Sequence, residues 1–287
     1  MNIAIVGSSG YIARYLESSM LGRRAAERIY RIGRHEQDHM YLDLSQYIRF
    51  DYNQLQMLDF IIFAAAVSSP DQCKNEFQKS WNINVTGTEF FIYQALQRNC
   101  KVIFLSSDAV FGADIGEAFD EYSETKADSS YGIMKKRIED TFCQNINFKT
   151  VRLSYVVSAE DRFAKYCREC MVRKREAEIF HPFYRNCITV GDVSEIIGWL
   201  IKNWKRFKPG CVNAAGTELV SRIRIADEIN RLFNGRLNYK IVAPDLGFFS
   251  ERHEIIQMKS RFIEKYGMVK TANFTEKFAA EWKGVCL

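Results

Sequence analysis

The first half of this 287-residue chain alternates short apolar runs with stretches of helical periodicity, and this alternation most constrains the fold. The apolar runs cover residues 2–6, 28–32, 40–42, 60–64, 101–106 and 148–153, and the helical stretches cover 11–21, 78–98 and 131–145. Continuous apolar runs rich in β-branched and aromatic residues are typical of parallel strands that are buried on both faces. The helices between them supply the crossovers, so the sequence predicts an α/β fold, a doubly wound parallel sheet of the Rossmann type.

The second half is less regular and predicts a smaller, mixed C-terminal lobe. Helical patterns cover residues 162–175, 193–204, 223–232 and 254–266, and the apolar run 211–214 is expected to return to the sheet. We therefore expect a dinucleotide-binding domain in residues 1–155, with 186–214 returning to it. Residues 156–185 and 215–287 are expected to form a substrate-binding lobe.

Composition and charge limit the classes of function. Lysine and arginine number 40 against 35 acidic residues, a net charge of +5 that is spread along the chain. Nucleic-acid binders usually gather such charge on one stripe, so we expect no nucleic-acid partner. No apolar run approaches the roughly 20 residues that span a bilayer, and the chain opens on a strand rather than a charged leader. We expect a cytoplasmic protein that does not bind membranes.

The cysteines and histidines predict no metal site. Eight cysteines are scattered along the chain, a distribution that favours reduced thiols over a disulfide framework. Cys167 and Cys170 form a lone Cys-x-x-Cys without a second cysteine pair or a nearby histidine pair, so we expect two ordinary thiols on a helix. His181 and His253 are isolated and indicate no metal ligation.

A glycine turn joins the first predicted strand to the first predicted helix. Gly7 and Gly10 stand where backbone angles closed to other residues are needed and where a diphosphate can approach the main chain. Ser9, Tyr11 and Ile12 complete the turn and the helix N-terminus, whose free N–H groups suit phosphate oxygens. Because the turn is the first strand-to-helix connection of an alternating α/β pattern, it predicts dinucleotide binding.

The end of the second predicted strand discriminates between the two nicotinamide cofactors. An acidic residue there would bind the ribose 2′-hydroxyl, whereas an arginine accommodates a 2′-phosphate. The sequence places Arg31 and Arg34 there and no acid until Glu36. NADP(H) is therefore favoured, through Arg34 first and Arg31 second, and NAD(H) stays open as the alternative. Asp43, after the third strand, is expected to meet the adenine amino group or else to act as a simple cap.

Tyr131 and Lys135 are four residues apart on a predicted helix, so they share one face. A phenol has an ordinary pKa of about 10, and a nearby ammonium is expected to lower that pKa toward the working range. Tyr131 then donates a proton to a carbonyl oxygen as a hydride arrives at the carbon. Ser107, at the end of the strand before this helix, is expected to hold the same oxygen, and Lys135 to fix the nicotinamide ribose.

Several further motifs occur in order along the chain. In one-letter code they are FAAA (63–66), NINV (82–85), FLSSDAVFG (104–112), YGIMK (131–135), VRLSYV (151–156), TVGDV (189–193) and VNAAG (212–216). With the glycine turn, this set resembles the extended short-chain dehydrogenase/reductase family. Within that family the chain is most similar to dTDP-4-dehydrorhamnose reductases and related nucleotide-sugar-modifying enzymes. Ala13 stands where the family's third glycine would be, and its small methyl still permits close helix–strand packing.

The resemblance implies a nucleotide-diphosphate sugar held between the cofactor domain and the C-terminal lobe. It implies catalytic roles for Ser107, Tyr131 and Lys135. It also implies that Leu44, Ala64, Ala65 and Ala66 contact the cofactor and that Ser68, Ser107, Asp108, Arg185 and Arg252 contact the substrate. The two arginines are expected to bind the anionic diphosphate. Asn84 is expected either to line the cleft or to tie its helix to the catalytic strand.

The leading hypothesis is an NAD(P)-dependent oxidoreductase, namely an NADPH-dependent reductase of a keto group on a nucleotide-activated deoxysugar, with Tyr131 as general acid. One alternative is an NAD-dependent epimerase or dehydratase that recycles its own cofactor within one turnover. A second alternative is a non-catalytic NADP-binding subunit that regulates a partner enzyme. The helices at 78–98 and 131–145 offer a face for a homodimer.

Overall fold

The chain folds around a seven-stranded parallel sheet. The computed structural model describes residues 1–22, 26–113, 116–245 and 247–287. In spatial order the strands are β11 (Cys211–Ala214), β6 (Phe148–Leu153), β5 (Lys101–Ser107), β4 (Phe60–Phe63), β1 (Asn2–Val6), β2 (Arg28–Gly33) and β3 (Met40–Tyr41). Each predicted strand of the first half is present, and β11 joins the sheet from the second half as expected. The α/β doubly wound prediction is confirmed.

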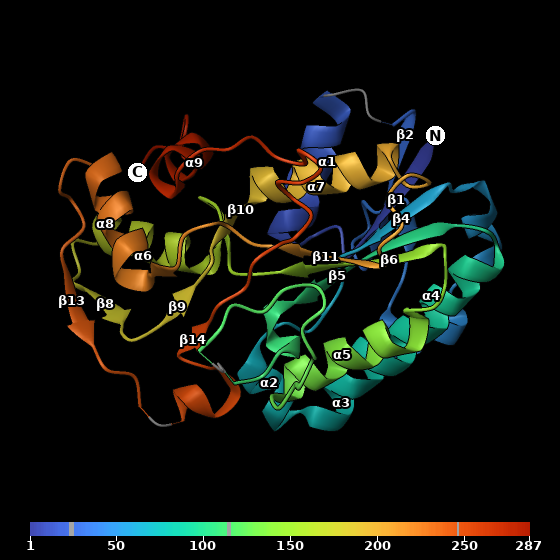
Figure 1. Cartoon of the computed structure of the whole chain (residues 1–287), viewed down its shortest axis with the longest axis horizontal. Helices are drawn as coiled ribbons and strands as arrows, with labels where there is room; N and C mark the ends of the chain where they lie inside the picture. Colours follow the sequence, from blue (N-terminus) through green and yellow to red (C-terminus); the bar gives the residue numbers. More distant parts are fainter. Residues whose placement is uncertain (23–25, 114–115, 246) are drawn as a thin grey trace.

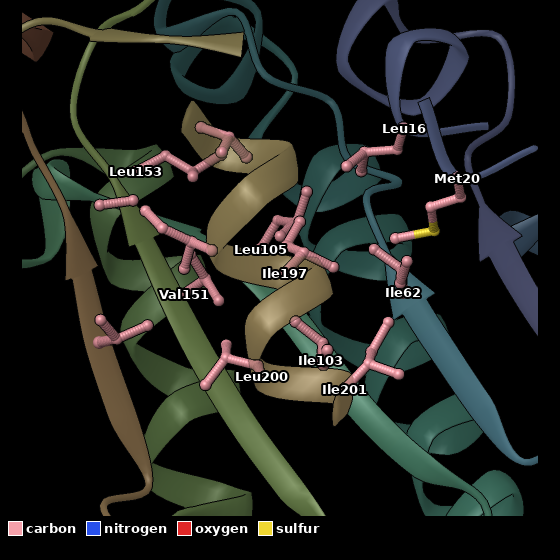
Figure 2. Close-up of a cluster of buried hydrophobic side chains, with 14 of the residues drawn as sticks. Leu16, Met20, Ile62, Ile103, Leu105, Val151, Leu153, Ile197, Leu200 and Ile201 are labelled. Atoms are coloured by element: carbon pink, nitrogen blue, oxygen red, sulfur yellow. The ribbon is translucent and has the colours of Figure 1, made fainter. Parts of the chain in front are cut away.

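Helices cover both faces of this sheet, so alternate residues of each strand enter different cores. On one face lie α1 (Tyr11–Gly22) and α7 (Val190–Lys202), which Figure 1 shows above the sheet. In β4, Ile62 points to this face, whereas Ile61 and Phe63 enter the core on the other face. Figure 2 shows the first core, in which Leu16 and Met20 of α1 and Ile197, Leu200 and Ile201 of α7 meet strand residues Ile62, Ile103, Leu105 and Val151.

The opposite face carries helices from the middle of the chain. They are α2 (Pro70–Asn75), α3 (Phe77–Trp81), α4 (Thr88–Gln97) and α5 (Ser130–Phe142), with the 3₁₀ helices η1 (Leu44–Arg49) and η2 (Tyr52–Met57) nearby. The long helix predicted at 78–98 is present, but a π-helical segment, η3 (Asn82–Gly87), interrupts it. Within this segment the Asn84 side chain donates to the Val67 carbonyl (2.9 Å) and accepts from the Val67 N–H (2.8 Å). Asn84 therefore ties this helix to the chain after β4, the second of its two expected roles.

The second half builds a smaller group of elements beside the sheet, at the left of Figure 1. Its helices are α6 (Arg162–Val172), α8 (Arg222–Leu232) and α9 (Phe274–Glu281), with the 3₁₀ helix η5 (Phe248–Glu251). Its strands form three small sheets: β7 (Val156–Val157) with β10 (Ile188–Thr189), β8 (Ala177–Phe180) with β13 (Tyr239–Val242), and β9 (Tyr184–Arg185) between β12 (Val220–Ser221) and β14 (Ile255–Ile256). Cys167 and Cys170 are buried in the apolar core of this group, as expected of two helical thiols.

The helix predicted at 254–266 is wrong. The segment contains the short strand β14 and then turns. Its apolar side chains enter separate cores, because Ile256 and Met258 pack with Phe119 while Phe262 packs on the face of the large sheet. The helix-like spacing of these residues therefore comes from an extended segment that crosses between two cores. Throughout the described ranges, no helix is both long and apolar enough to cross a membrane.

Candidate active site

A large cavity, about 560 Å³, opens at the carboxyl ends of β1, β2, β4 and β5. This edge of a doubly wound sheet is where ligands bind, because the crossovers diverge there. All of the residues predicted to contact the cofactor line it: Gly7, Ser9, Gly10, Tyr11, Ile12, Arg34, Asp43, Leu44, Ala64, Ala65, Ala66, Tyr131 and Lys135. Ser68, predicted to contact the substrate, lines it as well.

The glycine turn is shaped for close approach of a ligand to the main chain. Gly7 has φ +85°, and a Cβ on it would lie 2.7 Å from the Ala65 backbone, so only glycine fits. Its N–H donates to Ile32 and its carbonyl accepts from Gly10, which closes the turn at the start of α1. The start of α1 lines the cavity, and the free N–H groups of a first helical turn suit the pyrophosphate of a dinucleotide.

Asp38 joins this turn to the end of β2. Its side chain is 3% exposed and accepts hydrogen bonds from Ser8 Oγ (2.6 Å) and from the His35 backbone N–H (3.0 Å). Arg31 is occupied by Glu17 and by the Gln37 carbonyl, whereas Arg34 is exposed at the cavity wall. Arg34 is thus the better placed of the two arginines for a 2′-phosphate.

Asp43 caps η1, the second of its two expected roles. Its carboxylate accepts from the Ser45 N–H (2.9 Å) and the Ser45 hydroxyl (2.8 Å). Asp43 also lines the cavity, so its predicted contact with adenine stays a prediction.

Tyr131 and Lys135 lie one turn apart at the start of α5. Lys135 Nζ is 5.7 Å from the centroid of the Tyr131 ring and donates a hydrogen bond to the Leu105 carbonyl (2.8 Å). The first turn of α5 lies so close to the segment after β5 that a Cβ on Gly132 would clash with the Ala109 carbonyl oxygen. Lower on the helix, a buried bidentate pair joins Glu139 to Arg152 of β6 (2.7 Å).

The expected effect of Lys135 on the tyrosine is wrong for this arrangement. Burial raises the pKa of the Tyr131 phenol, and Cys73 and Asp108 act in the same direction. Burial also lowers the pKa of Lys135 to about 8. Tyr131 is consequently protonated at neutral pH, which is the state that a proton donor requires.

Ser107 and Asp108 form a small polar group next to this helix. Ser107 Oγ donates to Asp108 Oδ1 (3.0 Å) and accepts from the Ala109 N–H (3.2 Å). Ser106, not Ser107, lines the large cavity, and its hydroxyl is buried without a hydrogen-bond partner among the described residues. Sequence reasoning missed Ser106, which the same Ser-Ser pair at the strand end could have indicated.

The two arginines predicted to bind the substrate are both engaged within the protein. Arg185 Nε pairs with Asp108 Oδ2 (3.3 Å), and its two Nη atoms donate to the carbonyls of Tyr184, His253 and Glu254. Arg252 forms a bidentate pair with Asp71 of α2 (2.6 and 2.7 Å). Their contact with a substrate stays a prediction, and it requires these internal partners to be exchanged.

The segment around η5 bridges the two groups of elements. The Glu251 carboxylate accepts a hydrogen bond from the Ser130 N–H (2.7 Å), and His253 contacts Asp128 (2.8 Å). Lys74 of α2 donates to Ser250 (3.1 Å). The second half of the chain thus reaches the first turn of α5 directly.

Further cavity residues were not found from the sequence. They are His35, Ser69, Gln72, Glu76, Lys79, Ser80, Ile83 and Arg162. Six of the eight come from residues 69–83, the segment after β4 that contains α2 and α3. The sequence contains a signal for the start of α2, because a serine before a proline, here Ser69 before Pro70, is typical of a helix N-cap. In the structure the Ser69 hydroxyl accepts a hydrogen bond from the Gln72 N–H. Within the described ranges, no group of three or more His, Cys, Asp or Glu side chains is arranged to hold a metal ion.

Residues 1–279 match the family model described as RmlD substrate binding domain. The chain belongs to this family. The match covers nearly the whole sequence and confirms the resemblance drawn from the motifs. None of the curated protein sequences matches the chain.

Solved structures share the fold over almost the entire chain. A dTDP-4-dehydrorhamnose reductase from Clostridium acetobutylicum has a TM-score of 0.82 at 18% identity, covering 96% of both chains. The Bacillus anthracis dTDP-4-dehydrorhamnose reductase in complex with NADP has a TM-score of 0.80 at 20% identity, again covering 96% of both. A Thermus thermophilus UDP-glucose 4-epimerase complex with NAD has a TM-score of 0.80 at 14% identity, covering 100% of both. At these identities the similarity establishes the fold.

Proposed function

We propose that this protein is an NADPH-dependent reductase of a keto group on a nucleotide-activated deoxysugar, with Tyr131 as the general acid. The observation that carries the proposal is that Tyr131, Lys135 and the glycine turn line the same cavity. Acid–base groups and a dinucleotide turn at the same sheet edge fit hydride transfer to a carbonyl.

NADPH fits the cavity better than NADH. Gly7 admits a diphosphate to the main chain, and the exposed guanidinium of Arg34 stands at the end of β2. The buried Asp38 carboxylate accepts hydrogen bonds from Ser8 and His35 and is not among the residues that line the cavity, which favours NADPH over a cofactor with a free ribose 2′-hydroxyl. A solved relative, the Bacillus anthracis dTDP-4-dehydrorhamnose reductase, was crystallised with NADP.

The proposed reaction converts a carbonyl to a secondary alcohol. NADPH, when bound, supplies the hydride to the carbonyl carbon. Tyr131 gives its proton to the carbonyl oxygen, so that the alcohol and NADP⁺ leave and the phenol recovers a proton from solvent. Lys135, held by Leu105, orients the nicotinamide ribose, and Ser107 steadies the carbonyl oxygen.

The substrate class rests on the family and on the lobe beside the cavity. Solved relatives are dTDP-4-dehydrorhamnose reductases, and other structures of this fold contain UDP-glucose or UDP-glucuronic acid. We place the nucleotide-diphosphate sugar between the cofactor domain (1–155 with 186–214) and the lobe of residues 156–185 and 215–287. A homodimer through the helices of residues 78–98 and 131–145 is a further prediction.

The test is spectrophotometric loss of NADPH with a panel of 4-keto nucleotide sugars. We expect turnover of at least one compound, and a fall of about 10²- to 10⁴-fold in kcat for Tyr131→Phe. Tyr122→Phe, which alters an exposed tyrosine, is the matched control. Tightly bound NAD with no net NADPH consumption would instead support the epimerase or dehydratase. Biological activity unchanged in Tyr131→Phe would support the regulatory subunit.

A further inference from the structure

A row of ionisable side chains runs along the inward face of α5. Tyr131, Lys135 and Glu139 follow one another at intervals of four residues, so each lies one turn beyond the previous one on the same face. Lys135 and Glu139 are only 4% and 6% exposed. We call these three side chains, together with Arg152 of β6, the α5 charge row.

Arg152 holds the end of the row that is farthest from Tyr131. Its Nη2 and Nε atoms donate to Glu139 Oε2 at 2.7 and 3.0 Å, and both side chains are buried. The guanidinium carbon also lies 5.1 Å from the centroid of the Phe111 ring. Because apolar residues can often replace a buried ion pair without loss of stability, stability alone does not explain a charged pair at this place.

Lys135 has no anion of its own. Its Nζ atom donates to the Leu105 carbonyl (2.8 Å) and lies 4.5 Å from the centroid of the Phe104 ring, but it forms no ion pair with a carboxylate of the described residues. A carbonyl and an aromatic face replace only part of the hydration that a buried ammonium loses. Burial accordingly lowers the pKa of Lys135 to about 8, and the charge of Glu139 acts in the opposite direction.

The other titratable groups on the elements around α5 are neutral or already paired with a cation. They are Cys73 of α2, Glu89 of α4, Glu251 of η5 and Asp108 of the short 3₁₀ helix η4 (Asp108–Val110). The Cys73 thiol is neutral because burial raises its pKa. The three carboxylates pair with Arg137, Lys74 and Arg185, respectively. Glu139 is thus the anion that shares the inward face of α5 with Lys135.

The proposed reaction needs the ammonium form of Lys135 at two points. Bound NADPH offers ribose hydroxyls, and a charged donor binds them more strongly than a neutral amine does. Once Tyr131 has given up its proton, the phenolate is stabilised by a cation one turn away. A neutral amine would weaken the first contact and remove the second.

We propose that Glu139 is a positioning residue of the active site, whose carboxylate, fixed by Arg152, keeps Lys135 in its charged form. Glu139 does not line the cavity, so it acts on the cofactor and on Tyr131 only through Lys135. Its effect on turnover rests on the proposed function. Its effect on NADPH binding can be measured without a sugar substrate.

The experiment measures NADPH affinity by fluorescence titration from about pH 6 to about pH 10, without substrate. In the wild type the affinity should fall as the pH rises through the pKa of Lys135, and Lys135→Met should lack this fall. Glu139→Gln removes the charge at nearly constant size, so the fall should begin at a pH at least about one unit lower. Asp140→Asn makes the same change of charge at an exposed position of α5 and is the control, which should keep the wild-type profile.

The double variant Glu139→Met/Arg152→Met decides the question if Glu139→Gln fails to fold because Arg152 has lost its partner. It replaces the pair with apolar side chains and should displace the profile in the same direction. A wild-type profile in either folded variant would mean a structural ion pair only and would overturn the inference. A wild-type affinity that does not change with pH would also overturn it. Failure of the proposed function is distinct, since it appears as unchanged NADPH absorbance in the turnover assay.

Discussion

Ser8 donates a hydrogen bond of 2.6 Å to Asp38, which joins the glycine turn after β1 to the loop after β2. The Asp38 carboxylate also accepts from the His35 N–H, next to Arg34. One buried carboxylate therefore joins the glycine turn to the loop after β2, and both of these segments line the cofactor cavity.

Asp38→Ala should loosen both walls. The buried hydroxyl of Ser8 and the N–H of His35 lose a charged acceptor, so the free energy of unfolding should fall by about 1.5–3 kcal/mol. NADPH affinity should fall with it, as measured by fluorescence titration and urea unfolding. Glu36→Gln, an exposed change in the same loop, is the control. Unaltered NADPH binding in Asp38→Ala would show that the loop keeps its position without the carboxylate.

Arg34→Ala should reduce the preference for NADPH over NADH. The guanidinium at the cavity wall offers a charged donor to a 2′-phosphate, a contact that NADH cannot make. Losing it should raise the dissociation constant for NADPH roughly 10- to 100-fold and leave that for NADH nearly unchanged. Parallel titrations with both cofactors measure the ratio, and an equal loss for the two would contradict the assignment.

Gly132→Ala should impair catalysis although it changes neither Tyr131 nor Lys135. The new methyl would clash with the Ala109 carbonyl oxygen, so the first turn of α5 must move away from the segment that follows β5. A displacement on the order of 1 Å costs about 10²-fold in kcat. Gly198→Ala, in α7 with open space around it, is the control and should raise stability by about 0.5–1 kcal/mol. Near wild-type kcat in Gly132→Ala would refute this positioning.

Lys135 should make stability depend on pH. Burial lowers its pKa from the ordinary 10.5 to about 8 in the folded protein. Between these two values the unfolded chain binds more protons than the folded one, so this group makes stability rise with pH across the window. From pH 7 to pH 10 the free energy of unfolding of the wild type should rise by an amount on the order of 3 kcal/mol more than that of Lys135→Met. Urea unfolding of both proteins without cofactor measures this difference. Lys136→Met is the control, and parallel curves for wild type and Lys135→Met would contradict the burial argument.

Local patterns were sufficient to predict the sheet and the cavity. Each central strand is apolar throughout because helices cover both faces, so its run stands out in the sequence. The glycine turn, Tyr131 and Lys135 then fall at strand ends, and parallel topology brings those ends to one edge. The division of roles between 1–155 and the second lobe stays a prediction.

Long-range partners were beyond the reach of the sequence. Arg252 and Asp71 are 181 residues apart, and nothing near either residue signals their pairing. The same holds for Arg185, which lies in β9 of a small separate sheet and pairs with Asp108. The prediction that Lys135 lowers the pKa of Tyr131 was wrong for a related reason. The spacing of the two residues places an ammonium near a phenol, but it does not reveal the burial that raises the pKa of that phenol.

The Glu251 carboxylate accepts a hydrogen bond from the backbone N–H of Ser130, the residue immediately before Tyr131. A displacement of the η5 segment would therefore have to break this hydrogen bond or move the first turn of α5 with it. The position of Tyr131 is therefore coupled to that of η5, a segment from the other half of the chain.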